Sequence, residues 1–186
     1  MRTFIALNLP RDERERLHAS LEPLRARGLP VRWVEADSLH ITLKFLGEIE
    51  GVEVEPLNAA LATVAARHGP LELQLGGFGA FPSLRRANVF WLGVSDDGPL
   101  DRLQRELELT MSRMGYAREY KPFRAHLTVG RTRGEARAPD VERLAAGIDY
   151  KGTVRIETLD LMRSHTGGTG SRYEALARWT LGEKHE

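Results

Sequence analysis

The chain has 186 residues, 41% of them hydrophobic, and it contains no cysteine. This length is enough to bury a core, while the lack of cysteine excludes disulfides, thiolate nucleophiles and cysteine-ligated metal sites. The 27 basic and 26 acidic side chains leave a net charge of +1, which argues against a protein that coats nucleic acid through bulk charge, so any phosphate recognition must be local.

Apolar residues at spacings of three and four predict helices, and alternating apolar residues predict strands. In chain order the expected elements are a strand at 3–7, a helix over 10–28, strands at 31–34 and 40–46, a helix over 54–69, a strand at 71–75, a turn region at 76–83, a strand at 88–94, a helix that Asp97 caps and that ends near Gly115, a strand that begins at His126, a short helix from Pro139, and strands at 153–162 and 173–181.

Each half of the chain therefore mixes strands and helices, which indicates the α+β class. No low-complexity linker separates the halves, and the opening apolar run is too short for a secretory leader or a membrane span. We expect a single domain over 1–186 that is cytoplasmic and monomeric, with no membrane and no obligate protein partner.

One pattern occurs twice, as His40-Ile41-Thr42-Leu43 and as His126-Leu127-Thr128-Val129. Successive side chains of a strand point to opposite faces, so the His and Thr of each copy share one face and the apolar residues share the other. By strict alternation Phe45 joins the apolar face of the first copy. The repetition predicts a central cleft to which two equivalent strands each contribute an imidazole and a hydroxyl.

Two histidines can work together near neutral pH when one is neutral and acts as general base and the other is charged and acts as general acid. Without a nucleophilic side chain, this pair suits displacement at phosphorus, with Thr42 and Thr128 binding the non-bridging oxygens. Arg131 could add positive charge to the phosphate site, provided that the strand ends or bulges at Gly130, because strict alternation points it to the other face.

The two motifs resemble those of the two-histidine phosphoesterase superfamily, and most closely its prokaryotic RNA 2′,3′-cyclic phosphodiesterase branch, also called 2′-5′ RNA ligase. The likeness covers nearly the whole chain. Its further, less specific parts are Lys44-Phe45-Leu46-Gly47 and Gly130-Arg131 beside the motifs, residues 2–7, Phe81-Pro82, residues 88–91, Ser164 and Tyr173.

The resemblance implies a bilobal, pseudo-twofold fold in which two antiparallel sheets line a central cleft and helices lie outside. It implies metal-independent opening of a terminal 2′,3′-cyclic phosphate on RNA to a 2′-phosphate, and in some members the reverse 2′-5′ joining of RNA. In these terms His40 protonates the departing 3′ oxygen, His126 activates water, and Thr42 and Thr128 bind the phosphate.

Three other interpretations are a metalloenzyme, a binding module and a phosphodiesterase for small nucleotides. A metalloenzyme is disfavoured because each His-x-Thr strand supplies only one metal ligand, so we expect no metal and no cofactor. The cleft could bind phosphorylated RNA ends without turning them over, or the substrate could be a small cyclic nucleotide. Whether the ligand is an RNA end or a small nucleotide, Phe45, Trp91 and Arg124 are candidate contacts to it through stacking or charge.

Overall fold

The structure is a computed structural model, and it describes residues 1–28, 30–132, 150–167 and 170–183. The short helix expected from Pro139 lies outside the described residues. None of the described helices combines the length and the apolar character that a membrane span requires.

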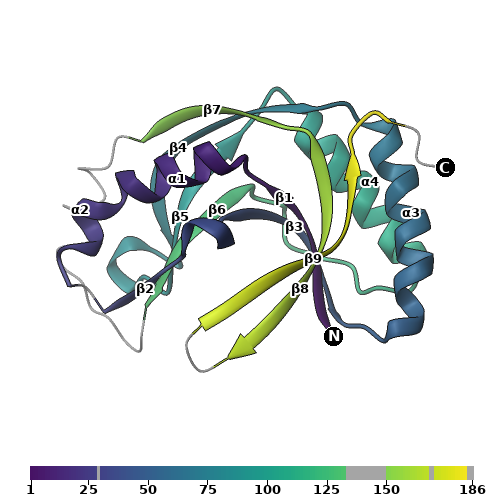
Figure 1. The fold of residues 1–186 in the computed structure, drawn as a ribbon, viewed down its shortest axis with the longest axis horizontal. Helices are drawn as coiled ribbons and strands as arrows, with labels where there is room; N and C mark the ends of the chain where they lie inside the picture. The colour runs from purple at the N-terminus through teal and green to yellow at the C-terminus, as the bar shows by residue number, and fades with distance from the viewer. Residues whose placement is uncertain (29, 133–149, 168–169, 184–186) are drawn as a thin grey trace.

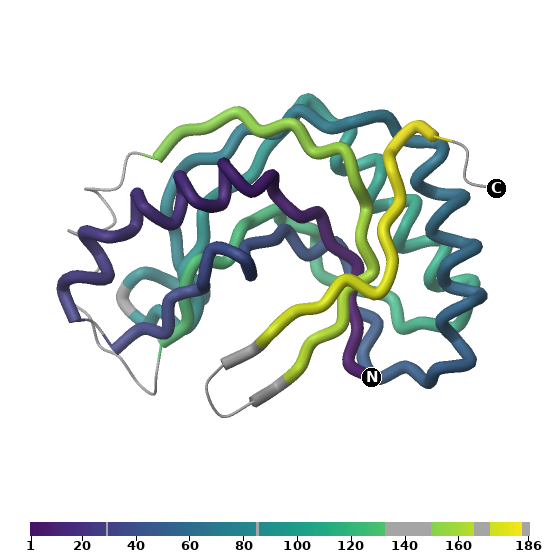
Figure 2. Tube along the Cα trace, viewed as in Figure 1, coloured from purple at the N-terminus to yellow at the C-terminus, as the bar shows by residue number. Residues whose placement is uncertain are grey.

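The described strands form one antiparallel sheet of nine strands, which curves strongly (Figures 1 and 2). Its order is β7-β4-β5-β6-β3-β1-β8-β9, and β2 pairs with β6 beside this path. The strands are β1 Arg2–Asn8, β2 Val31–Trp33, β3 His40–Glu48, β4 Leu71–Phe81, β5 Val89–Ser95, β6 His126–Thr132, β7 Lys151–Ile156, β8 Thr158–Gly167 and β9 Gly170–Thr180.

The two motif strands lie together at the centre of this sheet. From the centre outward, β6 is followed by β5, β4 and β7 on one side, and β3 is followed by β1, β8 and β9 on the other. The pair that joins β3 to β6 is Ile41 with Leu127, which hold the same position in the two motifs. The α+β class is confirmed, but this pairing joins the strands into one sheet where we expected two. A division into two lobes stays a prediction.

The helices lie over both halves of the sheet, with α1 and α2 near β4–β7 and with α3 and α4 beside β8 and β9 (Figure 1). The helices are α1 Arg11–Ser20, α2 Glu22–Arg25, α3 Val54–Arg67 and α4 Pro99–Arg113, and short 3-10 turns are η1 Ala36–Ser38, η2 Gly51–Glu53 and η3 Leu84–Arg86.

Two helix predictions need correction. The helix expected over 10–28 is interrupted at Leu21, which separates α1 from α2. The cap of α4 is supplied by Asp96, whose carboxylate accepts hydrogen bonds from the backbone N–H groups of Gly98 and Leu100, and Asp97 does not take this role.

Two strand predictions also need correction. The turn region expected at 76–83 is mostly strand, because β4 continues to Phe81 past an irregularity at Gly77, where φ is +75° and glycine is favoured. The strand expected at 153–162 is divided after Ile156, since β7 pairs with β4 whereas β8 pairs with β1 and β9.

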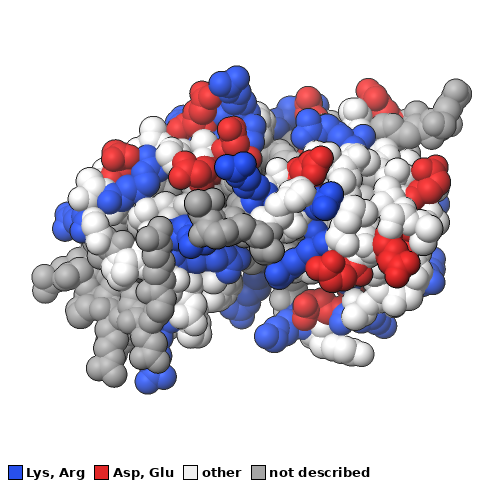
Figure 3. Space-filling model, turned by 60° about the horizontal axis from the view of Figure 1, so that its bottom comes forward, with Lys and Arg blue, Asp and Glu red and all other residues white. Residues whose placement is uncertain are grey.

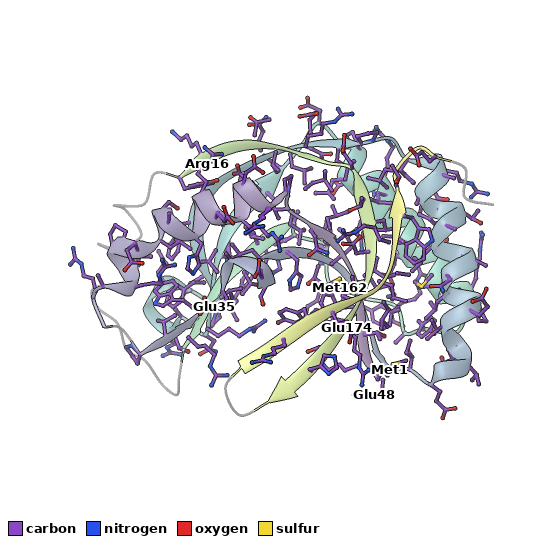
Figure 4. The ribbon with its side chains drawn as sticks, viewed as in Figure 1. Met1, Arg16, Glu35, Glu48, Met162 and Glu174 are labelled. Atoms are coloured by element: carbon purple, nitrogen blue, oxygen red, sulfur yellow. The ribbon has the colours of Figure 1, made fainter. Side chains whose placement is uncertain are left out.

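The main core lies between the helices and one face of the sheet, and it includes Ile5, Ile41 and Leu127. A second, small cluster lies on the opposite face and consists of Phe4, Ala6 and Met162, with Tyr173 packed against it. Met162 lies near the middle of the molecule in Figure 4. Strand β1 is therefore buried on both faces, which explains why its apolar run from Phe4 to Leu7 does not alternate.

A polar cluster fastens α1 to the beginning of β7. The buried carboxylate of Glu13 accepts a hydrogen bond from the Tyr150 hydroxyl and pairs with Arg16 at 2.7 Å. The Arg16 guanidinium also lies 5.3 Å from the centre of the Tyr150 ring, at the place where α1 approaches β7 in Figure 4. Burial and the hydrogen bond to Glu13 raise the pKa of Tyr150, so the phenol stays a donor.

Candidate active site

His40 and His126 lie on the same face of the sheet, which we call the site face. Ile41 and Leu127 are direct partners and both point into the main core, so the residues before them point the other way. Both rings are held in the same manner. Nδ1 of His40 donates to the Ser38 carbonyl at 2.7 Å, and Nδ1 of His126 donates to the Arg124 carbonyl at 2.7 Å.

These hydrogen bonds determine which nitrogen can react. A carbonyl oxygen only accepts, so Nδ1 carries the proton in both rings, and Nε2 is the atom that gains or loses a proton. Each arm thus presents one titratable nitrogen with a fixed ring orientation, which is what general acid–base chemistry requires.

Both motif strands contain a β-bulge at the same place, directly after the threonine. In β3, Ala6 pairs with Thr42 and Ile5 pairs with Lys44, so Leu43 is the extra residue. In β6, Trp91 pairs with Thr128 and Phe90 pairs with Gly130, so Val129 is the extra residue. Each bulge reverses the alternation of the residues that follow it.

The bulge in β3 corrects the position expected for Phe45. Leu43 and Lys44 are both buried in succession, and Phe45 is 62% exposed, with its ring 5.9 Å from that of Phe4 in the small cluster of the site face. Phe45 is therefore on the site face, and it does not share the apolar face with Leu43.

The bulge in β6 meets the condition under which Arg131 can serve the site. Val129 and Gly130 are both buried, and Arg131 is exposed. Its charge acts on His40, because the positive charges of Arg131 and His126 both lower the pKa of that imidazole. Arg131 and His126 are thus close enough to His40 to act on its charge, and Arg131 occupies in β6 the position of Phe45 in β3.

Burial is the largest cause of the lowered pKa of His40, and the hydrogen bond from Nδ1 to the Ser38 carbonyl opposes it. The ring of His40 lies against two aromatic rings, with centroids 4.9 Å from Phe4 and 4.7 Å from Tyr173. In the ligand-free protein His40 is consequently neutral more readily than an exposed histidine.

Different aromatic residues surround His126. Phe81 makes an edge contact with the His126 ring at 5.3 Å and lies 5.2 Å from Trp91. Trp91 pairs directly with Thr128 and so shares the site face, where its ring fills the space that a side chain at Gly79 would take, 2.3 Å from an ideal Cβ. Trp91 Nε1 is buried and has no hydrogen-bond acceptor among the described residues.

The two bulged strands are supported by different contacts. Behind β3, the Lys44 Nζ donates to both carboxylate oxygens of Glu108 at 3.0 and 2.9 Å and to the Ala117 carbonyl at 2.8 Å. Beside β6, Gly130 leaves room for side chains of the paired strand β2, since an added Cβ would lie 2.8 Å from Val31 Cγ1 and 2.9 Å from Trp33 Cε3.

A cavity of about 380 Å³ lies beyond Asn8, the residue of β1 that pairs with His40. Four arginines line it, and each has an ion pair with a carboxylate: Arg11 with Glu15, Arg14 with Asp37, Arg155 with Glu72 and Glu157, and Arg178 with the buried Asp160. Its charge is therefore largely neutralised, and it contains neither motif histidine.

The structure thus brings seven of the expected residues to the site face or its edge. His40, Thr42, Phe45, His126, Thr128, Trp91 and Arg131 share that face, and Arg124 is exposed and contributes its carbonyl. Phe4 and Phe81 were not expected beside the histidines. The continuous apolar run of β1, which a strand buried on both faces requires, was the available signal for Phe4.

Comparison with known proteins agrees with this geometry. The sequence profile of the 2′-5′ RNA ligase superfamily matches residues 11–168, so the chain belongs to this superfamily. One similar relative is the RNA 2′,3′-cyclic phosphodiesterase of Thermotoga maritima, which is 31% identical over 178 residues; the match covers 95% of this chain and 93% of the relative. Another is the RNA 2′,3′-cyclic phosphodiesterase of Methanothermobacter thermautotrophicus, which is 29% identical over 177 residues; the match covers 93% of this chain and 95% of the relative.

Solved structures share the fold. The crystal structure of E. coli LigT complexed with 3′-AMP is 27% identical, has a TM-score of 0.74, and covers 98% of each chain. The crystal structure of TT0787 of Thermus thermophilus has a TM-score of 0.80 over 100% of each chain at 24% identity.

Proposed function

We propose that this chain is an RNA 2′,3′-cyclic phosphodiesterase, which hydrolyses a terminal 2′,3′-cyclic phosphate to a 2′-phosphate. The observation that carries the proposal is the matched pair of arms: two imidazoles with the same Nδ1 hydrogen bond, each followed by a threonine and a bulge, on one face of the sheet. The activity for which the relatives are named and the 3′-AMP bound by LigT support the same substrate class.

The chemistry that we propose uses both rings. Nε2 of His126 takes a proton from water as the oxygen attacks phosphorus, and Nε2 of His40 gives a proton to the 3′ oxygen as its bond to phosphorus breaks. The 2′ ester remains. Thr42, Thr128 and Arg131 bind the non-bridging oxygens, whose negative charge is greatest in the transition state.

The lowered pKa of His40 places a condition on this assignment. An acid must carry its proton when the substrate is bound, and the neighbouring cation Arg131 opposes that protonation. The bound phosphate is an anion, and its charge raises the pKa of the His40 imidazole. His40 therefore takes up its proton when the substrate binds, or the substrate binds the minor fraction of the free protein in which His40 is already protonated.

The test is hydrolysis of an oligoribonucleotide ending in a 2′,3′-cyclic phosphate, in excess chelator, with the product identified as the 2′- or the 3′-phosphate. We expect the 2′-phosphate, and we expect His40→Ala and His126→Ala each to lower kcat by about 10²- to 10⁴-fold, the usual contribution of a general acid or base. His68→Gln is the control, because His68 pairs with Glu106 and contacts neither motif.

Binding of the oligonucleotide without turnover would indicate a binding module. Loss of activity in chelator would indicate a metalloenzyme. Either result would overturn the proposal.

A further inference from the structure

Two arginines face each other on neighbouring strands beside the proposed phosphate site. Arg32 of β2 is the direct partner of Arg131 of β6, and both are exposed. Directly paired residues of antiparallel strands point to the same face, with Cβ atoms roughly 4.5–5.5 Å apart. The neighbours of Arg32 agree with this orientation, because Val31 and Trp33 pack against the main core.

This pair is unfavourable unless an anion is bound. Like charges directly opposite each other destabilise a sheet. Within the part of the chain that the structure describes, neither Arg32 nor Arg131 has an ion pair with a carboxylate, unlike Arg155 and Arg178 of the neighbouring cavity. The lower side of the molecule, which Figure 3 turns toward the reader, carries a group of Lys and Arg near its middle.

The two arginines differ in their relation to the histidines. Arg131 acts electrostatically on His40, and Arg32 lies on the next strand, facing Arg131. Arg131 is thus shared between the reacting phosphate and a position farther from the histidines. A guanidinium presents a planar fork of donors that suits phosphate oxygens, so a second phosphate fits at this position.

We propose that Arg32, together with Arg131, binds a second phosphate group of the substrate, on the 5′ side of the nucleotide that carries the cyclic phosphate. This proposal rests on the proposed function and names its substrate class: a nucleotide with a 2′,3′-cyclic phosphate and a further phosphate on its 5′ oxygen. That phosphate can be the phosphodiester of an RNA chain or a terminal 5′-phosphate.

Three substrates distinguish these sources: adenosine 2′,3′-cyclic phosphate, the same nucleotide with a 5′-phosphate, and a diadenosine dinucleotide ending in a 2′,3′-cyclic phosphate. We expect the wild type to have a higher kcat/KM for the dinucleotide than for the cyclic mononucleotide. In Arg32→Gln we expect the ratio of these two values to fall about tenfold, the loss of roughly one charge-assisted hydrogen bond.

Arg105→Gln is the matched control, because Arg105 is an exposed arginine of α4 whose loss changes the net charge equally. A ratio that stays the same in Arg32→Gln, or that falls equally in Arg105→Gln, would overturn the proposal. A gain from the 5′-phosphate as large as that from the dinucleotide would assign the site to a terminal phosphate, and a gain from the dinucleotide alone would assign it to the RNA chain.

Thermal melting provides a readout that is independent of turnover. Removing one of two facing cations should raise the melting temperature of the ligand-free Arg32→Gln protein in chloride buffer, and should reduce the further rise that inorganic phosphate produces in the wild type. If the wild type hydrolyses none of the three substrates, the proposed function is wrong. Equal phosphate-induced shifts in wild type and Arg32→Gln would then overturn the Arg32 proposal separately.

Discussion

At the scale of single residues, the two arms have the same proposed catalytic groups and different neighbours. Each arm places one side chain on the site face after its bulge, and this side chain is Phe45 in β3 and Arg131 in β6. An aromatic ring on one side and a cation on the other make the two ends of the site chemically unequal. A substrate with a base at one end and a phosphate at the other is thereby given a preferred direction.

The pH dependence of Arg131→Gln tests which histidine is the acid. Removing this cation raises the pKa of His40, because one of the charges that disfavour its protonation is gone. If His40 is the acid, kcat/KM falls as pH rises through its pKa, so this falling limb should move to higher pH in the variant. The measurement is the pH profile of kcat/KM for wild type and variant.

The same profile would show a reversed assignment. If the rising limb on the acidic side moves to higher pH and the falling limb does not, His40 is the base. Arg2→Gln is the control for net charge, since Arg2 is exposed and lies at the end of β1 away from Asn8, the residue opposite His40.

At the scale of secondary-structure elements, the matched bulges decide which residues reach the site. Without them, Phe45 and Arg131 would point into the core, where a charged guanidinium has no partner. The supports of the two bulged strands differ, since a buried Lys44–Glu108 pair supports β3 and the paired strand β2 supports β6. The second support depends on the absence of a side chain at Gly130.

Gly130→Ala tests that support. The added Cβ would lie 2.8 Å from Val31 and 2.9 Å from Trp33, so β2 must move away from β6. We expect a loss of about 1–3 kcal/mol in the free energy of unfolding, typical of an overpacked core, measured by chemical denaturation. Because β2 carries Arg32, phosphate binding should weaken as well.

Gly51→Ala is the control for this substitution. An added Cβ at Gly51 has no neighbour within 4 Å, so we expect little change in stability. Equal stabilities for the wild type and Gly130→Ala would contradict the close packing of β2 on β6.

At the scale of the whole molecule, the distance between the two histidines depends on the junction of β3 and β6. This junction is centred on the pair Ile41 and Leu127, and both side chains are fully buried. The residues before them are His40 and His126, so a change in the packing of this pair acts directly on the separation of the two rings.

Ile41→Ala should therefore reduce activity as well as stability. We expect a loss of roughly 2–5 kcal/mol in the free energy of unfolding, as for other buried Ile-to-Ala changes, and a lower kcat per folded molecule. Stability is measured by denaturant unfolding, and kcat is measured under conditions in which the protein stays folded.

Leu61→Ala is the matched control, because Leu61 is equally buried but belongs to α3. It should lose similar stability and retain its kcat. Equal kcat values for the two variants would show that the central pair does not determine the geometry of the site.

The sequence by itself determined the catalytic candidates and most of the elements. The duplicated His-x-Thr pattern, the alternation in β3 and β6, and the leucine spacing of α3 and α4 are local signals, and they were sufficient to predict the catalytic candidates and the α+β class. They needed no knowledge of which strands are neighbours, because side-chain direction within a regular strand or helix follows from its period alone.

Only the tertiary structure decided the features that depend on register. The bulges at Leu43 and Val129 exist because β3 and β6 each oppose a partner strand with one residue fewer, and no local pattern shows this. The positions of Phe45, Arg131 and Arg32, and the closure of nine strands into one sheet, follow from pairing between distant segments. Pairing across the sheet is a non-local property, so these positions became known only when the strands were placed side by side.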